Sequence, residues 1–334
     1  MAKWRELPAF ESPTYARVRA LALSNSTTRR RIVLAAKLLI VAVVFWLAWG
    51  TMQQSWTYLR EHPRSFRPNW LALSGGLYLL ALLPEGLFWQ WALKALGQDV
   101  GLFETLRAYY IGHLGKYVPG KAMVIVLRSG LIHSHRVDTG IAVASVFLET
   151  LTMMAVGACI AVPVLATWST KNPAFMAAAA GTAVAAGLVT LPPVFSRLAR
   201  MLGVGRSSPA VAQKLAGFDY RTLICGWTIM VFGWIVMGTS LWAMLRGLDL
   251  EADLGQSWYL YTAIVAMAVV GGFASMIPGG LGPRELIFTG LLGPLVGGDA
   301  MALIVAAALR LTWLLAELLI SAILYSFRWV RPES

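Results

Sequence analysis

Four ionisable residues surround a break in an otherwise apolar part of the sequence. Residues 277–285 read Ile-Pro-Gly-Gly-Leu-Gly-Pro-Arg-Glu and lie between two apolar runs. A helix cannot continue through two prolines and three glycines in six residues, because proline lacks an N–H and glycine favours the unfolded chain. Arg284 and Glu285 follow the break directly. Arg310 and Glu317 lie seven residues apart in the next apolar run, so they share one helix face.

Charged residues inside a membrane segment usually mark a pathway or a site, and broken backbone survives there only where protein buries it or where it lines a wet cavity. We therefore interpret 277–285 as a hinge or re-entrant element at a polar cavity. Arg284, Glu285, Arg310 and Glu317 are the predicted substrate-binding residues of this region. The alternative is an ion-pair network that only holds the protein together.

A second break lies at Pro119 and Gly120, within the sequence Gly-His-Leu-Gly-Lys-Tyr-Val-Pro-Gly-Lys of residues 112–121. This sequence fits the phosphate-loop pattern as far as its last lysine. However, Ala122 stands where that loop needs a Ser or Thr for magnesium, and the proline removes an amide that would cradle phosphate. We exclude nucleotide binding on this ground.

The cations near the second break fit a lipid phosphate better. Lys116, Lys121 and Arg128 lie beside the interrupted helix, and free amides at a helix start favour anions. We add these three to the predicted substrate-binding residues. The alternative is that they are interfacial cations whose side chains reach towards water.

Two acids, Glu85 and Glu149, lie alone in other apolar runs. Either one carries a coupling proton or is the buried partner of an arginine, and the sequence leaves both interpretations open. No catalytic arrangement emerges, since the four histidines lack metal-ligand spacing and no Gly-x-Ser-x-Gly sequence occurs. We therefore expect no enzyme activity, no cofactor and no metal site.

The composition is that of an integral membrane protein. Of 334 residues, 58% are hydrophobic and only 13% are charged, with a mean hydropathy of +0.66. Soluble domains carry about 25% charged residues. The net charge is +12, but the basic residues lie mainly between apolar runs, which indicates membrane topology and anionic lipid heads rather than nucleic acid.

The apolar runs predict an all-α fold, a polytopic membrane helical bundle with broken or re-entrant Pro-Gly segments. Runs long enough to cross the bilayer occur at 32–49, 70–96, 141–168, 173–195, 223–245, 258–276 and 301–327. The basic segments predict cytoplasmic termini and hence an even number of crossings. Adding 284–296 as a short tilted segment gives about eight crossings. We expect residues 1–28 to form a cytoplasmic segment and 29–334 a single transmembrane domain.

The two breaks also suggest two weakly related halves. Residues 112–120 end in Val-Pro-Gly and residues 271–279 end in Ile-Pro-Gly, and each motif precedes a long run with an embedded ionisable residue. Broken segments at matching places in two halves are typical of transporter sites, although a chance likeness is as good an explanation. The predicted hinge residues are Pro119, Gly120, Pro278, Gly279, Gly280, Gly282 and Pro283.

With residues 112–121, residues 277–285 and Arg310, the sequence resembles the integral membrane domain of the lysylphosphatidylglycerol synthase/flippase family. The resemblance runs from about the first span to the last. It implies a helical fold with a lipid-accessible cavity and movement of a lipid between leaflets. The sequence ends at Ser334, soon after its last span, so we expect it to lack the soluble domain that transfers an aminoacyl group from tRNA.

These observations predict a lipid translocase of the cell inner membrane that moves a phospholipid or related anionic lipid. A membrane-embedded enzyme and an accessory scaffold in lipid or glycan assembly are the alternatives. The expected partners are membrane lipids, while a homo-oligomer and a separate lipid-modifying enzyme stay open. Nucleic acid is not an expected partner.

Overall fold

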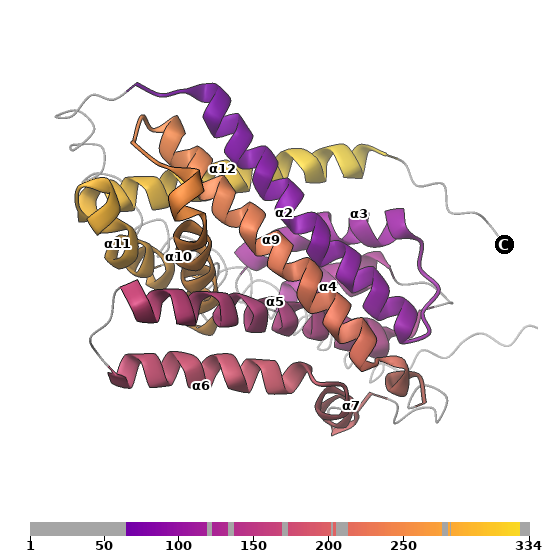
Figure 1. The fold of residues 1–334 in the computed structure, drawn as a ribbon. Helices are drawn as coiled ribbons and strands as arrows, with labels where there is room; N and C mark the ends of the chain where they lie inside the picture. The colour runs from indigo at the N-terminus through magenta and orange to yellow at the C-terminus, as the bar shows by residue number, and fades with distance from the viewer. Residues whose placement is uncertain are drawn as a thin grey trace, which may run out of the picture. The chain divides into compact units, whose positions relative to one another are not determined.

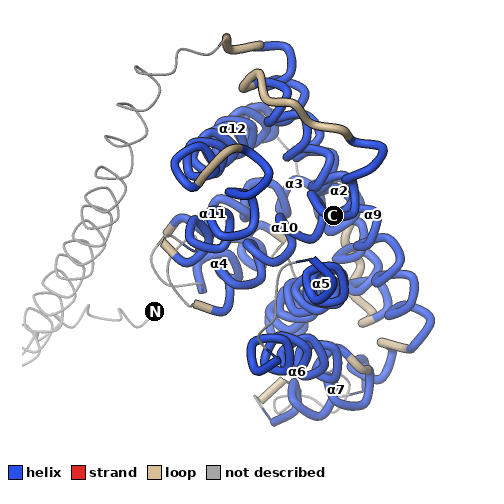
Figure 2. The backbone as a smooth tube through the Cα atoms, turned by 60° about the vertical axis from the view of Figure 1, so that its left-hand side comes forward, coloured by secondary structure: helices blue, strands red, loops and turns tan. Residues whose placement is uncertain are grey.

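A computed structural model describes residues 65–118, 122–132, 137–168, 173–201, 203–204, 213–275, 280 and 282–327. All of them belong to the second of two compact units, Gly50–Ser334. Every regular element of these residues is a helix, as Figure 2 shows, which confirms the predicted all-α fold. The first predicted run, 32–49, together with Pro119, Gly120, Lys121, Pro278 and Gly279, lies outside the described residues.

The helices follow one another in the order shown in Figure 1. They are α2 (Pro68–Ala95), α3 (Leu102–His113), the 3-10 helix η1 (Leu114–Tyr117), α4 (Ala122–Leu131), α5 (Thr139–Trp168), α6 (Pro173–Thr190), α7 (Pro192–Met201), the 3-10 helix η2 (Leu215–Gly217), α9 (Tyr220–Gly247), α10 (Leu254–Ala274), α11 (Pro283–Val296) and α12 (Asp299–Ser326).

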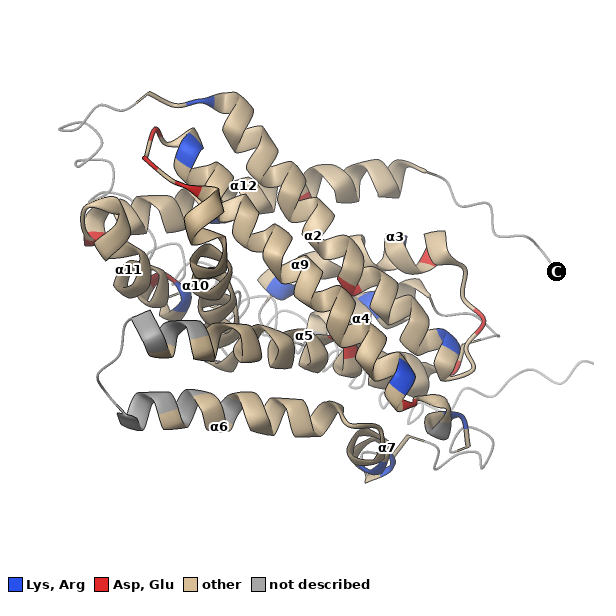
Figure 3. Ribbon diagram, in the orientation of Figure 1, with Lys and Arg blue, Asp and Glu red and all other residues tan. Residues whose placement is uncertain are grey.

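Five of these helices are long and apolar enough to cross a membrane. They are α2, residues Thr139–Pro163 of α5, α9, α10 and α12, and they coincide with five of the predicted runs. Figure 3 shows how few charged residues their ribbons carry. The predicted run 173–195 is instead divided into α6 and α7. Pro192 disfavours a helical conformation in Leu191 before it and then begins the next helix. The number of crossings stays a prediction.

Helices α2 and α9 run antiparallel along each other (Figure 1) and make the most extensive contact between two of the described helices. Small residues allow this close approach. Ser74 and Ser240 each donate a hydroxyl hydrogen bond of 2.8 Å to the other's backbone carbonyl. One end of the contact brings Gly226 against Phe88, where a Cβ at residue 226 would overlap the aromatic ring. The two helices therefore fix each other's register through residues that tolerate little change in size.

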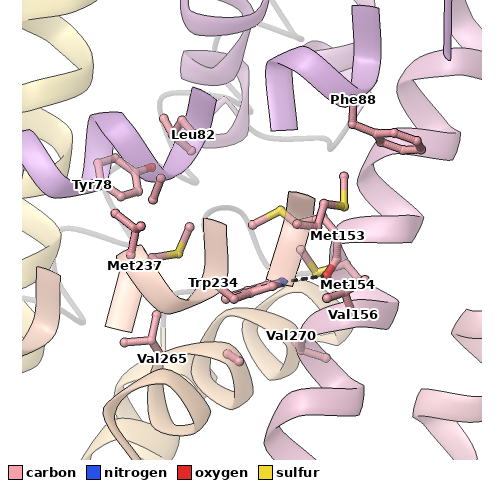
Figure 4. Close-up of a cluster of buried hydrophobic side chains, with 14 of the residues drawn as sticks. Tyr78, Leu82, Phe88, Met153, Met154, Val156, Trp234, Met237, Val265 and Val270 are labelled. Atoms are coloured by element: carbon pink, nitrogen blue, oxygen red, sulfur yellow. Dashed lines mark hydrogen bonds between the residues drawn. The ribbon is translucent and has the colours of Figure 1, made fainter. Parts of the chain in front are cut away.

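Further helices pack on this pair and close the core. Figure 4 shows side chains of α2, α5, α9 and α10 meeting in one apolar cluster, with Trp234 at its centre. The Trp234 indole Nε1 donates a 3.1 Å hydrogen bond to the Met153 carbonyl of α5. The Trp313 indole of α12 donates to the Ser240 hydroxyl at 2.9 Å. The indoles combine large apolar burial with a satisfied polar atom, which orients the neighbouring helices.

After each break, the described residues form a short helix and then a long one. Helix α3 and η1 lead to the first break, and α4 and the long α5 follow it. Helix α10 leads to the second break, and α11 and the long α12 follow it. The packing is crosswise, since α5 contacts α10 and α12 contacts α3. The relation between the two halves stays a prediction, because a shared order of helices shows no common sequence.

Backbone conformation explains the glycines of the second break. Gly280 has a φ of +67° and Gly282 has a φ of +88°, a region that side chains rarely adopt. Gly280 also lies against the backbone of Gly272 in α10, where a Cβ would come within 2.8 Å of the Gly272 Cα. Pro283 then begins α11. The chain at Gly280 and helix α10 at Gly272 therefore approach each other more closely than residues with side chains would allow.

Candidate functional site

A cavity of about 320 Å³ lies where the two broken regions meet the long helices. Its volume falls at the lower end of the roughly 300–1,000 Å³ typical of small-molecule sites. Most of its wall is apolar, and its charged groups come from the segments on either side of the first break and from the two helices after the second break. The lining residues include Tyr78, Tyr109, His113, Lys116, Tyr117, Arg128, Glu149, Met153, Met154, Met237, Phe273, Gly280, Arg284, Arg310 and Trp313.

The first charged group of the cavity joins η1 to α12. The Lys116 ammonium lies 2.5 Å from the Glu317 carboxylate and 2.9 Å from the Tyr78 hydroxyl. Tyr78 also donates a hydrogen bond to Glu317. His113 Nε2 lies 3.3 Å from the same hydroxyl. Glu317 is 1% exposed, so its charge is stabilised by Lys116 rather than by solvent.

The second group joins α4 to α5 and is buried more deeply. Arg128 NH1 donates to a Glu149 carboxylate oxygen at 2.6 Å, and both side chains are 2% exposed. The Arg128 guanidinium lies 3.9 Å above the Tyr109 ring, and its NH2 lies 3.2 Å from His113 Nδ1. His113 therefore contacts both the Lys116 group and the Arg128 group through its two ring nitrogens.

Glu85 lies behind this second group. Its side chain comes from the middle of α2 and is 2% exposed. The Tyr109 hydroxyl donates a hydrogen bond to Glu85 and lies 3.3 Å from the Glu149 carboxylate. Within the described part of the chain, no lysine or arginine forms an ion pair with Glu85. Among the described residues, one tyrosine hydroxyl thus contacts two acids, of which only Glu149 forms an ion pair.

The third group joins α11 to α12. Arg310 NH1 lies 2.5 Å from a Glu285 oxygen, with the two side chains 17% and 18% exposed. The other Glu285 oxygen accepts a 2.7 Å hydrogen bond from the Gly282 amide at the start of α11. The amide at the start of α11 therefore orients the Glu285 carboxylate, which in turn binds Arg310. The arrangement mirrors Arg128 and Glu149 with the charges exchanged between the short and the long helix.

Arg284 is the cavity cation without a carboxylate partner among the described residues. Its guanidinium lies 4.8 Å from the centre of the Trp313 ring and 5.8 Å from that of Phe288. Cation–π contacts orient a guanidinium while leaving its N–H groups available for an acceptor. Arg284 is held against an aromatic wall with its hydrogen-bonding capacity unused by the described residues.

The structure gathers most of the predicted site residues around one cavity. Lys116, Arg128, Glu149, Arg284 and Arg310 line it. The remaining described acids contact those residues, with Glu317 on Lys116, Glu285 on Arg310, and Glu85 on Tyr109. Glu285 pairs with Arg310 rather than with its neighbour Arg284, and Glu317 pairs with Lys116. Their roles as ligands stay predictions.

Several aromatic residues of the site carried no prediction. Tyr78, Tyr109 and Trp313 hold the charged groups in place, and the Tyr78 and Trp313 rings are stacked with centroids 4.2 Å apart. One sequence signal was available, because Arg310, Trp313 and Glu317 follow the three- and four-residue spacing of a single helix face. His113 was considered only as a metal ligand, yet it lies between two charged groups.

Most of the sequence matches the membrane region of a known protein family. Residues 34–322 match the family model described as the lysylphosphatidylglycerol synthase TM region. No curated protein matches the chain. The family model and the apolar helices together show a multi-pass membrane protein. Since the match covers most of the 334 residues, the chain belongs to the lysylphosphatidylglycerol synthase transmembrane-region family.

Proposed function

We propose that this protein is a lipid translocase of the bacterial inner membrane that carries an anionic phospholipid or related lipid between leaflets through the cavity. The observation that carries the proposal is Arg284, a cavity arginine without a carboxylate partner among the described residues. In this proposal both termini are cytoplasmic, and the chain performs no enzymatic reaction of its own.

The charges of the cavity support an anionic cargo. Lys116, Arg128 and Arg310 are each paired with a glutamate, so their charges are balanced within the protein. Arg284 adds a positive charge that no described carboxylate balances. An uncompensated charge inside a membrane protein is costly, and a phosphate from a lipid headgroup would offset that cost when it binds.

A second donor in the same cavity fits the same cargo. Arg128 Nε is buried and has no hydrogen-bond partner among the described residues. Guanidinium groups bind phosphate oxygens with two parallel hydrogen bonds, so Arg128 and Arg284 both offer donors suited to a phosphate. The methionine and phenylalanine side chains of the wall suit the glycerol and upper acyl region, while the acyl chains stay in lipid.

Translocation in reconstituted vesicles tests the proposal. Purified protein is placed in liposomes with phosphatidylglycerol labelled on an acyl chain, and an impermeant quencher reports the label left in the outer leaflet. We expect the wild type to speed exchange between leaflets. Arg284→Ala should slow it about ten- to hundredfold, because a charge-assisted hydrogen bond contributes about 1.5–3 kcal/mol.

Arg246→Ala is the matched control. Arg246 is also an arginine against an aromatic ring, 5.8 Å from the centre of Trp70, but it does not line the cavity. We expect this variant to translocate lipid like the wild type. Equal exchange by wild type, Arg284→Ala and protein-free vesicles would overturn the proposal. Turnover of a lipid substrate in detergent, where translocation has no meaning, would instead favour an enzyme.

A further inference from the structure

Glu85 differs from the other acids of the cavity region in its surroundings. Glu149, Glu285 and Glu317 each lie within 2.6 Å of a cationic nitrogen, whereas the hydrogen-bond partner of the Glu85 carboxyl among the described residues is the Tyr109 hydroxyl. Its side chain is 2% exposed and lies in the middle of a candidate membrane span. A buried carboxylate without a cation is costly, so Glu85 is stable there as the neutral carboxylic acid.

The Tyr109 hydroxyl links this acid to Glu149. It contacts Glu85 on one side and lies 3.3 Å from Glu149 on the other. A hydroxyl has one proton and two acceptor lone pairs, so it can receive a proton from one acid while giving its own to the other. Glu85, Tyr109 and Glu149 therefore form a short path along which a proton can pass from α2 to α5.

An independent observation indicates what would set the proton in motion. Arg128 holds Glu149 in its charged form through a 2.6 Å hydrogen bond, while Arg128 Nε is buried without a partner among the described residues. The Arg128 side chain also lines the cavity. An anion in the cavity would use the unpaired donor and compete with Glu149 for the guanidinium, so anion binding and the charge on Glu149 are linked.

We propose that the Glu85–Glu149 pair is a proton-binding site and that the protein carries a proton together with each anionic lipid. The inference rests on the translocase function proposed above. When a phosphate takes Arg128, the Tyr109 hydroxyl turns its O–H from Glu85 to Glu149. Glu149 receives the Tyr109 hydroxyl proton, and the Tyr109 oxygen receives the Glu85 proton. Glu85 then takes a proton from water. The phosphate's negative charge is thus accompanied by one proton, and the loaded site gains no net charge.

No cation of the described residues around Glu85 forms an ion pair with it that would neutralise its carboxylate in place of a proton. Helix α9, the main neighbour of α2, carries its two charged residues near its ends, at Arg221 and Arg246. Lys116 lies beyond Tyr78, where Glu317 holds it. Among the described residues, the ionisable groups that act on Glu85 from the surrounding elements are Tyr109 and Tyr110 of α3, Lys116 of η1, Arg128 of α4, Glu149 of α5 and Tyr78 of α2.

A pH gradient across the vesicle membrane tests the inference. Vesicles with labelled phosphatidylglycerol receive an acidic outside and an alkaline lumen, with the membrane potential clamped by potassium and valinomycin. Coupled movement of a lipid anion and a proton concentrates the label in the inner leaflet, up to about tenfold per pH unit. Glu85→Gln keeps the size and removes the proton site, so its label should distribute equally. The control Glu251→Gln, in the exposed loop before α10, should behave like the wild type.

Two results separate this inference from the translocase function. If the wild type exchanged the label between leaflets but the pH gradient did not change its distribution, the proposed proton site would be refuted and the translocase function would stand. No exchange at all would overturn both. Infrared spectroscopy of the purified protein tests the protonation of Glu85 without a transport assay, in case Glu85→Gln inserts poorly into vesicles. The wild type should show a carboxylic-acid C=O band that Glu85→Gln lacks, and absence of that band from the wild type would contradict a protonated Glu85.

Discussion

Removing one member of the Arg128–Glu149 pair should cost more than removing both. Arg128 and Glu149 are each 2% exposed and are joined at 2.6 Å. Arg128→Met leaves a buried carboxylate without its cation, and Glu149→Gln leaves a buried guanidinium without its anion. Breaking a buried pair on one side costs about 3–5 kcal/mol.

The two single variants should differ in a defined direction. Arg128 also lies 3.9 Å above the Tyr109 ring, a contact worth about 0.5–2 kcal/mol that Arg128→Met loses and Glu149→Gln keeps. Arg128→Met should therefore be the less stable single variant. The double variant Arg128→Met/Glu149→Gln carries neither charge, so its loss should fall below the sum of the single losses by about 3 kcal/mol or more.

Equilibrium unfolding in detergent micelles, followed by tryptophan fluorescence, measures these free energies. The coupling free energy between Arg128 and Glu149 is calculated from the unfolding free energies of the wild type, the two single variants and the double variant. Additive losses within about 0.5 kcal/mol would refute the reasoning, because they would show that the two charges do not stabilise each other in the folded protein. The same four proteins, compared in the vesicle assay, separate loss of fold from loss of translocation.

Two further predictions concern the helices that position the site. Gly226→Val should destabilise the protein by several kcal/mol, because the valine side chain would overlap the Phe88 ring. The control is Gly76→Ala in α2, where an added Cβ meets nothing within 4 Å. Similar unfolding midpoints for the two variants would contradict the close α2–α9 packing. Asp219→Ala should lower stability, while Asp219→Asn keeps the cap, because the Asp219 carboxylate accepts hydrogen bonds from the Thr222 amide and hydroxyl at 2.8 and 2.7 Å. The hydrogen bond from the Thr222 amide lowers the pKa of Asp219. The stability that this cap contributes is therefore fully present above the unfolded-state pKa of Asp219 and is lost as pH falls through the lower folded-state pKa. If acid destabilised the wild type no more than Asp219→Ala, this contribution would be excluded.

Much of the helical framework was readable from local sequence. Apolar runs predicted five of the long helices, and proline and glycine predicted the interruption between α10 and α11. The split of 173–195 was missed because its hydropathy is continuous, although Pro192 and Pro193 mark the boundary at Leu191. Local rules work for these features because backbone hydrogen bonding and steric limits act over a few residues.

The pairings within the site were not readable in the same way. Lys116 and Glu317 are 201 positions apart, and the packing of α3, which η1 follows directly, against α12 brings them together. Tyr109 gave no signal, because a tyrosine beside a second tyrosine in a helix is usually a packing residue. The charged residues of the cavity were predicted from the sequence, whereas the three-dimensional arrangement shows which of them form ion pairs among the described residues.

Native mass spectrometry with lipids retained tests the central claim most directly, namely that Arg284 receives an anionic lipid headgroup. Wild type, Arg284→Ala and Arg246→Ala are purified in parallel from the same membranes. The account predicts that the wild type and Arg246→Ala selectively retain one class of anionic lipid and that Arg284→Ala loses it. Equal and unselective retention by all three proteins would contradict the account and remove Arg284 as a ligand.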